Sequence, residues 1–208
     1  MWSNIVKEAL QDDEEREPDT SNKFSCYYAG SCKRQIYLSK LRLKDLPVHA
    51  LGSMQIGTLV HKWLENEVEY PDNYEPEKKF KFIEDGIKIS GRADVVTPDE
   101  VVDFKTINGF NYVNKSAERN KPQINLYMHG FNKTKGRLVY IDKGKMFVRE
   151  ITHDYNEELL EETISKYKKV LNAIKNTSLP VTSPEDIPFD KCGENCYLCK
   201  NEQLNIGD

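Results

Sequence analysis

Between residues 77 and 107 the apolar residues do not recur at helical spacing but occur in short or alternating runs. This feature constrains the fold more than any other in the sequence, because it requires a β-sheet. The runs EKKFKFIED, GIKISGRADVVT and EVVDFKTI each have the length of a strand. Asp85-Gly86 joins the first two runs, and Asp-Gly pairs are typical of tight hairpin turns. Pro98-Asp99-Glu100 separates the second run from the third. The region therefore predicts three strands, of which the first two pair antiparallel.

Helical patterns flank these strands on both sides. The spacing of apolar residues predicts helices over residues 31–44, 54–69, 120–131 and 160–174, and a second hairpin over residues 136–151. We expect Pro122 in the first turn of its helix, because proline suits that position. This order predicts one α/β domain over residues 1–208, with a mixed central sheet flanked by helices.

Length and charge exclude several classes of protein. The chain has 208 residues, which suits one full-sized domain. Its formal net charge of -4 predicts no general affinity for nucleic acid, so any polyanion must bind a local basic surface. No run approaches the about 20 apolar residues of a membrane span, and no basic segment followed by an apolar core opens the chain. We therefore expect a cytoplasmic protein without membrane association.

Two acids and a lysine form the most informative pattern. Gly91-Arg92-Ala93-Asp94 lies in the second strand run, and Asp103-Phe104-Lys105 lies in the third. Asp103 and Lys105 are two residues apart, so they project from the same face of their strand. Two carboxylates hold a divalent cation, and a neighbouring lysine positions water or stabilises the transition state of phosphoryl transfer. An Asp-x-Lys pair is more often a surface ion pair, but the apolar Val101-Val102 before it favours a functional site.

Two positions on the predicted helices extend this pattern. His61 follows Gly57 by four residues, and a lone helical histidine is more often structural. Beside the strands, however, its imidazole would be a nitrogen ligand for the same metal. Gln123 and Tyr127 are four residues apart and share one helix face. That face either packs half-buried on the core or places both side chains in the active cleft, where they touch substrate or orient Lys105.

The five cysteines indicate a metal centre. An odd count without a secretory signal argues against a disulfide framework. Cys192, Cys196 and Cys199 have C-x3-C-x2-C spacing, and a fourth ligand would come from Cys26 or Cys32. A three-plus-one arrangement suits a [4Fe-4S] cluster better than the paired knuckles of a tetrathiolate zinc site, so we expect iron–sulfur, with zinc as the alternative. Such a centre would join the two ends of the domain and act structurally.

In their order and separations, the motifs Gly57-x-x-x-His61, Gly-Arg-Ala-Asp94, Asp103-Phe-Lys105 and Gln123-x-x-x-Tyr127 resemble the PD-(D/E)xK nuclease superfamily, and within it the RecB-like nucleases. The resemblance implies a restriction-endonuclease-like core in which His61, Asp94 and Asp103 bind Mg²⁺ or Mn²⁺. It also implies Lys105 as the catalytic lysine, with Gln123 and Tyr127 as further active-site residues.

The segment around Cys32 carries a second part of the resemblance. Cys32-Lys-Arg-Gln-Ile-Tyr-Leu is similar to the segment that opens the CRISPR-associated RecB-like exonucleases and the AddB-type helicase–nucleases. Those families hold a [4Fe-4S] cluster by one cysteine before the nuclease motifs and three after them. The resemblance thus implies Cys32, Cys192, Cys196 and Cys199 as ligands and leaves Cys26 as a small buried residue. We expect an N-terminal helix and acidic linker over residues 1–24, cluster-binding segments over 25–50 and 180–208, and a nuclease core over 51–178.

Basic residues in two groups are candidates for contacts with a phosphate backbone. The candidates are Lys33, Arg34, Arg119 and Lys121. Aromatic residues near them, such as Tyr27 and Phe110, would stack on unpaired bases and favour single strands.

These features predict a metal-dependent deoxyribonuclease that cleaves the phosphodiester bonds of single-stranded DNA or DNA ends. The resemblance implies 5′ exonuclease activity, with endonuclease activity also open, in CRISPR adaptation beside integrase proteins or in the processing of viral or plasmid DNA. The alternative is a non-catalytic DNA-binding or protein-interaction module that is held together by a [4Fe-4S] or zinc site. The intact Asp94, Asp103 and Lys105 count against this alternative.

Overall fold

The computed structural model describes residues 17–45, 48–179, 181, 183–192, 196, 199 and 203–204. The helix that the sequence predicts at the N-terminus lies outside these residues. No described helix is long and apolar enough to cross a membrane.

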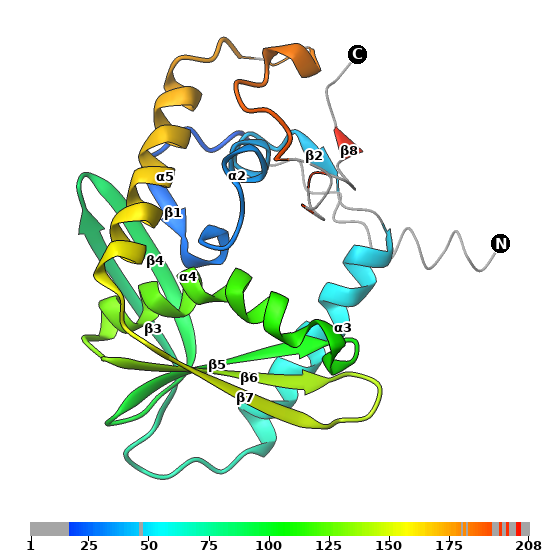
Figure 1. The fold of residues 1–208 in the computed structure, drawn as a ribbon, viewed down its shortest axis with the longest axis vertical. Coiled ribbons are helices and arrows are strands. Elements are labelled where there is room, and N and C mark those ends of the chain that lie inside the picture. The colour runs from blue at the N-terminus through cyan, green and yellow to red at the C-terminus, as the bar shows by residue number, and fades with distance from the viewer. Residues whose placement is uncertain are drawn as a thin grey trace, which may run out of the picture. The chain divides into compact units, whose positions relative to one another are not determined.

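The described helices and strands follow one another as shown in Figure 1. In chain order they are β1 (Lys23–Ser25), the 3-10 helix η1 (Cys26–Tyr28), α2 (Lys33–Lys40), β2 (Lys44–Asp45), α3 (Val48–Glu67), β3 (Glu75–Glu84), β4 (Ile87–Val96), β5 (Glu100–Ile107), η2 (Phe110–Tyr112), α4 (Val113–Phe131), β6 (Lys135–Asp142), β7 (Val148–Asp154), α5 (Glu157–Lys175), η3 (Pro184–Asp186) and β8 (Gln203–Leu204).

Contacts within the chain group it into two compact units. The sheet unit consists of Asn22–Ser31 and Gly57–Tyr167. The cysteine unit consists of Met1–Ser21, Cys32–Ile56 and Lys168–Asp208, so the division falls within α3 and within α5.

The sheet unit contains a six-stranded mixed sheet with the order β1-β4-β5-β6-β7, and β3 also pairs with β4. The pairs β3–β4, β4–β5 and β6–β7 are antiparallel, while β1–β4 and β5–β6 are parallel. Asp85 and Gly86 form the predicted tight turn, with φ values of 50° and 79°. The predicted fold class, a mixed sheet flanked by helices, is confirmed.

Helix α4 begins earlier than the sequence predicts. It starts at Val113, and Pro122 lies inside it rather than in its first turn. A proline in a helix interior removes one hydrogen bond and costs about 3 kcal/mol. Val113 and Ala117 are 1% and 3% exposed, so the added turns extend the buried face of the helix and offset this cost.

Glycines let α4 approach the sheet closely. A Cβ atom on Gly136 of β6 would lie 2.6 Å from Ile124 Cγ1, and one on Gly130 of α4 would lie 2.3 Å from Phe80 Cδ2. Contacts this short do not occur between packed atoms, so both positions require glycine, which has no side chain. The result is that α4 covers the face of the sheet to which Gly136 belongs (Figure 1).

In the cysteine unit, α2 ends at Lys40, before the predicted end at residue 44. Arg42 takes a left-handed conformation with a φ of 60°, and Leu43 N–H donates to Leu38 O at 2.9 Å. This arrangement closes a helix by satisfying one of its last carbonyl groups. The chain then enters β2, which pairs antiparallel with β8.

Candidate active site and metal centre

The two acids of the predicted site lie where β4 and β5 part. Val95 pairs with Val102 and Val96 with Val101, but the ladder between these strands does not continue to Asp94 and Asp103. The Asp94 carboxylate instead accepts a hydrogen bond from Phe104 N–H at 2.5 Å. A side chain therefore takes the place of the backbone partner that Phe104 would have in a continuous ladder.

Asp103 and Lys105 form a buried ion pair on β5. Lys105 Nζ lies 2.5 Å from Asp103 Oδ2, and the two side chains are 23% and 3% exposed. Apart from this ammonium group, Asp103 Oδ2 has no hydrogen-bond partner. The sequence predicts that both side chains project from one face of the strand, and in the structure they contact each other directly.

His61 reaches Asp94 from α3. Its Nδ1 atom lies 3.3 Å from Asp94 Oδ1. A Cβ atom on Gly57, one helical turn earlier, would lie 3.3 Å from Thr106 Oγ1 of β5. Helix α3 therefore packs closely against β5 at Thr106. The small residue at position 57 permits this close approach, which brings the imidazole to the acid.

Helix α4 supplies the glutamine and the tyrosine. Gln123 Nε2 donates to Tyr127 Oη at 2.8 Å, as their helical spacing suggests. Tyr127 is 4% exposed, and burial together with the nearby Asp103 raises the pKa of its phenol far above the usual value. The tyrosine therefore remains a neutral hydrogen-bonding group at every pH at which the protein would work.

The charges of the site influence one another strongly. Burial raises the pKa of the Asp103 carboxyl to about 6, although Lys105 opposes the shift. Burial alone would lower the pKa of Lys105, but Asp103 and Asp94 outweigh it and raise that pKa. The hydrogen bond to Asp94 raises the pKa of His61, while burial opposes it. A bound cation would favour the deprotonated forms of the two proposed ligands whose pKa values are raised, Asp103 and His61.

Several residues next to the site were not predicted from the sequence. Tyr140 of β6 pairs with Lys105, and its hydroxyl accepts a hydrogen bond from Asn120 Nδ2 at 2.9 Å. Partners on adjacent strands share a face, so Tyr140 lies beside the lysine. The parallel pairing of β5 with β6 has no signal in the local sequence, and this is why Tyr140 escaped prediction.

A second acidic pair lies beside Asp94. Burial and a hydrogen bond with Glu65 raise the pKa of Glu77 to about 7, while Arg92 opposes the shift from 2.5 Å away. Glu65 and Glu77 line a small cavity of about 10 Å³ that His61 and Asp94 also line. This is room for about one water molecule. Glu65 follows His61 by four residues, and this helical spacing is the signal that could have revealed it.

The four predicted cysteines converge in the cysteine unit. The Sγ atoms of Cys32, Cys192, Cys196 and Cys199 all lie within 4.8 Å of one another. Two of the separations are 3.6 Å, between Cys32 and Cys199, and 3.3 Å, between Cys192 and Cys199. Cys26 lies outside this group and is fully buried.

Contacts on both sides of the cysteine-rich segment hold it against α2. Arg34 Nη1 donates to Phe189 O at 2.6 Å, Lys33 Nζ lies 5.4 Å from the centre of the Phe189 ring, and Tyr37 packs edge-on against that ring. After the cysteines, β8 pairs with β2. The chain is therefore anchored before Cys192 and after Cys199.

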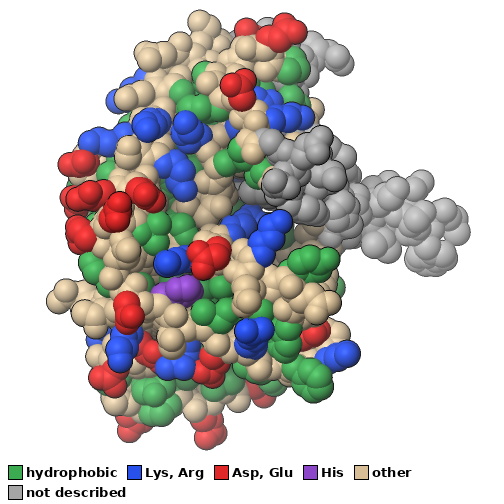
Figure 2. All heavy atoms as spheres, viewed as in Figure 1, with side chains coloured by type: hydrophobic (Ala, Val, Ile, Leu, Met, Phe, Trp, Pro, Cys, Tyr) green, Lys and Arg blue, Asp and Glu red, His purple; other side chains and the backbone are tan. Residues whose placement is uncertain are grey.

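The structure places the predicted DNA-binding residues in different settings. Arg119 is exposed, Lys121 is half-buried, and Lys33 contacts the Phe189 ring. Arg34 is 6% exposed and its guanidinium donates to the backbone, so we leave it out of the proposed DNA surface. On the face shown in Figure 2, side chains of Lys and Arg and of Asp and Glu are both present.

Both candidate metal sites have suitable donors. Two carboxylates and an imidazole suit Mg²⁺ or Mn²⁺, and the buried Asp103 Oδ2 already contacts one cation, the Lys105 ammonium group, at 2.5 Å. Four convergent thiols suit a tetrathiolate centre. Among the described residues, these four cysteines are the one group of three or more His, Cys, Asp or Glu side chains whose ligand atoms lie close enough together to hold a metal ion.

Comparison with known proteins agrees with this geometry. A family model of the PD-(D/E)XK nuclease superfamily matches residues 67–201. The crystal structure of SSO0001 is similar with a TM-score of 0.54 and 25% identity, covering 79% of this chain and 86% of that chain. The alkaline exonuclease LHK-Exo from Laribacter hongkongensis shares the fold with a TM-score of 0.52 and 12% identity, covering 74% of this chain and 88% of that chain.

No curated protein matches the chain. The match to the family model spans more than half of the sequence and includes Asp94, Asp103 and Lys105. On these grounds the chain belongs to the PD-(D/E)XK nuclease superfamily, as its motifs predicted.

Proposed function

We propose that the protein is a divalent-metal-dependent deoxyribonuclease whose active site is built from His61, Asp94, Asp103 and Lys105. One observation carries the proposal: Asp94 and Asp103 lie at the point where β4 and β5 part, with His61 3.3 Å from one acid and Lys105 2.5 Å from the other. The two units would together form one nuclease domain.

Each residue has a role that follows from its contacts. Asp94, Asp103 and His61 would hold Mg²⁺ or Mn²⁺, which polarises a phosphoryl oxygen and lowers the pKa of bound water. Lys105 stays protonated, because Asp103 and Asp94 raise its pKa, and its ammonium group donates to a phosphate oxygen or to the attacking water. Gln123 holds the Tyr127 hydroxyl, and this pair orients the substrate or Lys105.

The proposed substrate is single-stranded DNA or a DNA end, cut from the 5′ side, with endonuclease activity as a further possibility. The name of LHK-Exo, an alkaline exonuclease, is consistent with the exonuclease part. The exposed Arg119 and the half-buried Lys121 on α4 would contact the phosphate backbone. The biological setting that we propose is CRISPR adaptation beside integrase proteins, or the processing of viral or plasmid DNA, inside the cell.

We propose that Cys32, Cys192, Cys196 and Cys199 hold a structural [4Fe-4S] cluster, on the basis of their three-plus-one spacing. One observation favours zinc as a second candidate. A single ion with bonds of about 2.3 Å places tetrahedral sulfurs about 3.8 Å apart, close to the 3.6 Å and 3.3 Å separations seen here. In a four-iron cluster each thiolate binds its own iron, and the sulfurs would have to move apart. Elemental analysis of protein purified without oxygen distinguishes the two.

The test of the function is cleavage of end-labelled single-stranded DNA with Mn²⁺ by wild type, Lys105→Ala and Lys88→Ala. Lys88 is an exposed lysine on β4 and serves as the matched control. We expect wild type and Lys88→Ala to cut equally and Lys105→Ala to be inert. If all three are inert while the cysteine centre is loaded, the nuclease proposal fails, and a non-catalytic DNA-binding or protein-interaction module becomes the better account.

A further inference from the structure

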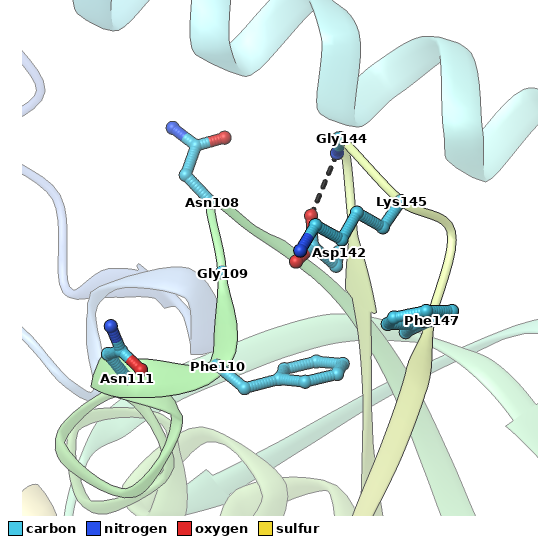
Figure 3. A pocket seen from close by; sticks show the side chains of 8 residues that line it. All are labelled: Asn108, Gly109, Phe110, Asn111, Asp142, Gly144, Lys145 and Phe147. Carbon is cyan, nitrogen blue, oxygen red and sulfur yellow. Dashed lines mark hydrogen bonds between the residues drawn. The ribbon is translucent and has the colours of Figure 1, made fainter.

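A cavity lined by described residues lies at the carboxyl ends of β5 and β6 (Figure 3). Its volume is about 530 Å³, and its walls come from the loop after β5 and from the hairpin loop between β6 and β7. Because β5 and β6 are parallel, their ends meet at one edge of the sheet. Neither the acids nor the lysine of the proposed active site lines this cavity.

Two phenylalanines from different segments contribute to its walls. Phe110 extends from η2, and Phe147 lies at the end of the hairpin loop, as Figure 3 labels them. Phe147 is 61% exposed, which leaves much of a large apolar ring in water. A flat aromatic ligand between or upon these rings would remove that apolar surface from water.

The polar groups of the cavity suit a nucleobase with an adjoining phosphate. Asn108 and Asn111 offer amide groups that donate and accept hydrogen bonds. Lys145 supplies a positive charge at the rim, where it is exposed. Asp142 is 7% exposed and is the one carboxylate that lines the cavity, so it repels phosphate and accepts from amino groups of bases. The base therefore belongs inside and the phosphate at Lys145.

Hydrogen bonds hold the hairpin loop in place. Asp142 N–H donates to Phe147 O at 2.9 Å, and Met146 N–H donates to Asp142 O at 2.7 Å. The Asp142 carboxylate accepts from Gly144 N–H at 2.8 Å, as Figure 3 shows. Lys143 N–H donates to Ile107 O at 2.9 Å and so ties this loop to the end of β5. The cavity walls are thus organised before any ligand binds.

We propose that this cavity binds one unpaired base of the DNA strand that the active site cleaves. The proposal deepens the proposed function and rests on it. Asn108 follows Lys105 by three residues on the same strand and its loop, a separation of about 10 Å at about 3.3 Å per residue. A single strand covers that distance with a few nucleotides, at about 3.4 Å for each stacked step. A base held there would orient the strand and set preference for unpaired DNA.

The experiment is a scan of single-stranded oligonucleotides in which one abasic residue is moved along the strand. We expect kcat/KM of the wild-type protein to fall about tenfold or more when the abasic residue reaches one position a few nucleotides from the cut, the loss expected for one base–aromatic stack. Phe110→Ala and Phe147→Ala should slow cleavage of the intact strand by a similar factor. They should slow cleavage of the sensitive abasic strand little further, because base and ring act as one pair.

Two neighbouring residues provide matched controls. Tyr112 shares η2 with Phe110 and is 69% exposed, and Val148 follows Phe147 and is 59% exposed, but neither lines the cavity. Tyr112→Ala and Val148→Ala should behave like wild type on every strand. The base site is wrong if kcat/KM does not depend on the position of the abasic residue, or if the phenylalanine variants slow cleavage of intact and abasic strands equally. Either result would leave the nuclease proposal intact.

A binding readout separates this proposal from the nuclease proposal. The probe is 2-aminopurine, which is moved along the strand in the same way as the abasic residue. Its fluorescence is quenched when the base stacks on an aromatic ring, and it is measured without Mn²⁺, so no cleavage is needed. If wild type cuts no DNA but quenches the probe, and Phe147→Ala does not, the base site stands and the nuclease proposal fails. If Phe147→Ala and Val148→Ala quench as wild type does, the base site is wrong.

Discussion

The Asp94 carboxylate accepts the backbone N–H of Phe104 at 2.5 Å, across the point where β4 and β5 part. This bond joins the acid of one strand to the residue between Asp103 and Lys105 on the next. It orients one carboxylate oxygen toward the backbone and leaves the other 3.3 Å from His61. The position of the acid is therefore set by the break in the sheet ladder itself.

Asp94→Asn should separate the structural role of this side chain from its chemical role. An amide oxygen still accepts from Phe104 N–H, so the melting temperature should stay near that of wild type. The lost charge weakens metal binding, and we expect cleavage to fall about 100-fold or more. Asp94→Ala removes the acceptor as well and should lower stability by about 1–3 kcal/mol. Thermal unfolding and DNA cleavage measured on both variants test this, and equal stability of the two would contradict it.

His61→Ala should act mainly on metal affinity. The imidazole is one of three proposed ligands, so we expect the Mn²⁺ concentration for half-maximal cleavage to rise about tenfold or more. The measurement is a titration of cleavage rate with Mn²⁺. Lys62→Ala changes the next residue of α3, which is exposed, and should leave the titration unchanged. A loss of rate that no concentration of Mn²⁺ restores, with unaltered affinity, would argue against His61 as a ligand.

Substitution of single cysteines should distinguish the metal ligands from Cys26, which we expect not to bind the metal. Cys192→Ser and Cys199→Ser should each lose most of the bound iron or zinc, since both belong to the convergent group. Cys26→Ala should retain the full metal content, because Cys26 lies outside the group. Metal content per chain and visible absorbance measure both. Loss of metal in Cys26→Ala alone would show that Cys26 is a ligand and that the proposed set of four cysteines is wrong.

Asp19 should make the protein sensitive to acid. Partial burial would raise the pKa of Asp19, but hydrogen bonds from Lys40 and Ser21 outweigh it and lower the pKa. A lowered folded pKa contributes stability above the unfolded value of about 3.9, and this is lost as pH falls through the folded pKa. Asp19→Asn should therefore melt below wild type at pH 7, and the gap should close as the pH falls below about 4. Asp72→Asn, at an exposed position, is the control and should melt as wild type does at pH 7.

Gly136→Ala should destabilise the sheet unit. Its new methyl group would lie 2.6 Å from Ile124 Cγ1, so α4 must shift from β6, at about 1–3 kcal/mol. Because α4 carries Gln123 and Tyr127, cleavage should fall as well. Gly144→Ala is the control, since its nearest atom would lie at an ordinary 3.4 Å. Denaturant unfolding of both variants checks the difference, and equal stability would refute the close packing of α4.

Local patterns in the sequence were enough to predict much of the site. Asp103 and Lys105 stand two apart on one strand, Gln123 and Tyr127 stand four apart on one helix, and both pairs are in direct contact. In each case the period of a single element determines which side chains meet. The turn at Asp85-Gly86 was predictable for the same reason, since its chemistry is local.

Features that depend on tertiary packing were not predictable in this way. Pro122 indicated a helix start, but the buried Val113 and Ala117 extend α4 through it. Arg34 has the sequence context of a phosphate contact, yet the Phe189 carbonyl, far along the chain, accepts its guanidinium. Tyr140 comes to Lys105 through a parallel pairing that no local pattern encodes. In each case a partner distant in sequence outweighs the local preference.

The convergence of Cys32 with Cys192, Cys196 and Cys199 also changes what a break in the chain would do. With a metal bound, the backbone between residues 32 and 192 is a closed ring rather than a strand with two free ends. A protease that cuts one exposed loop of the sheet unit would open the ring without releasing a fragment. Under conditions that unfold the packed sheet, the two pieces would still stay joined for as long as the metal remained bound.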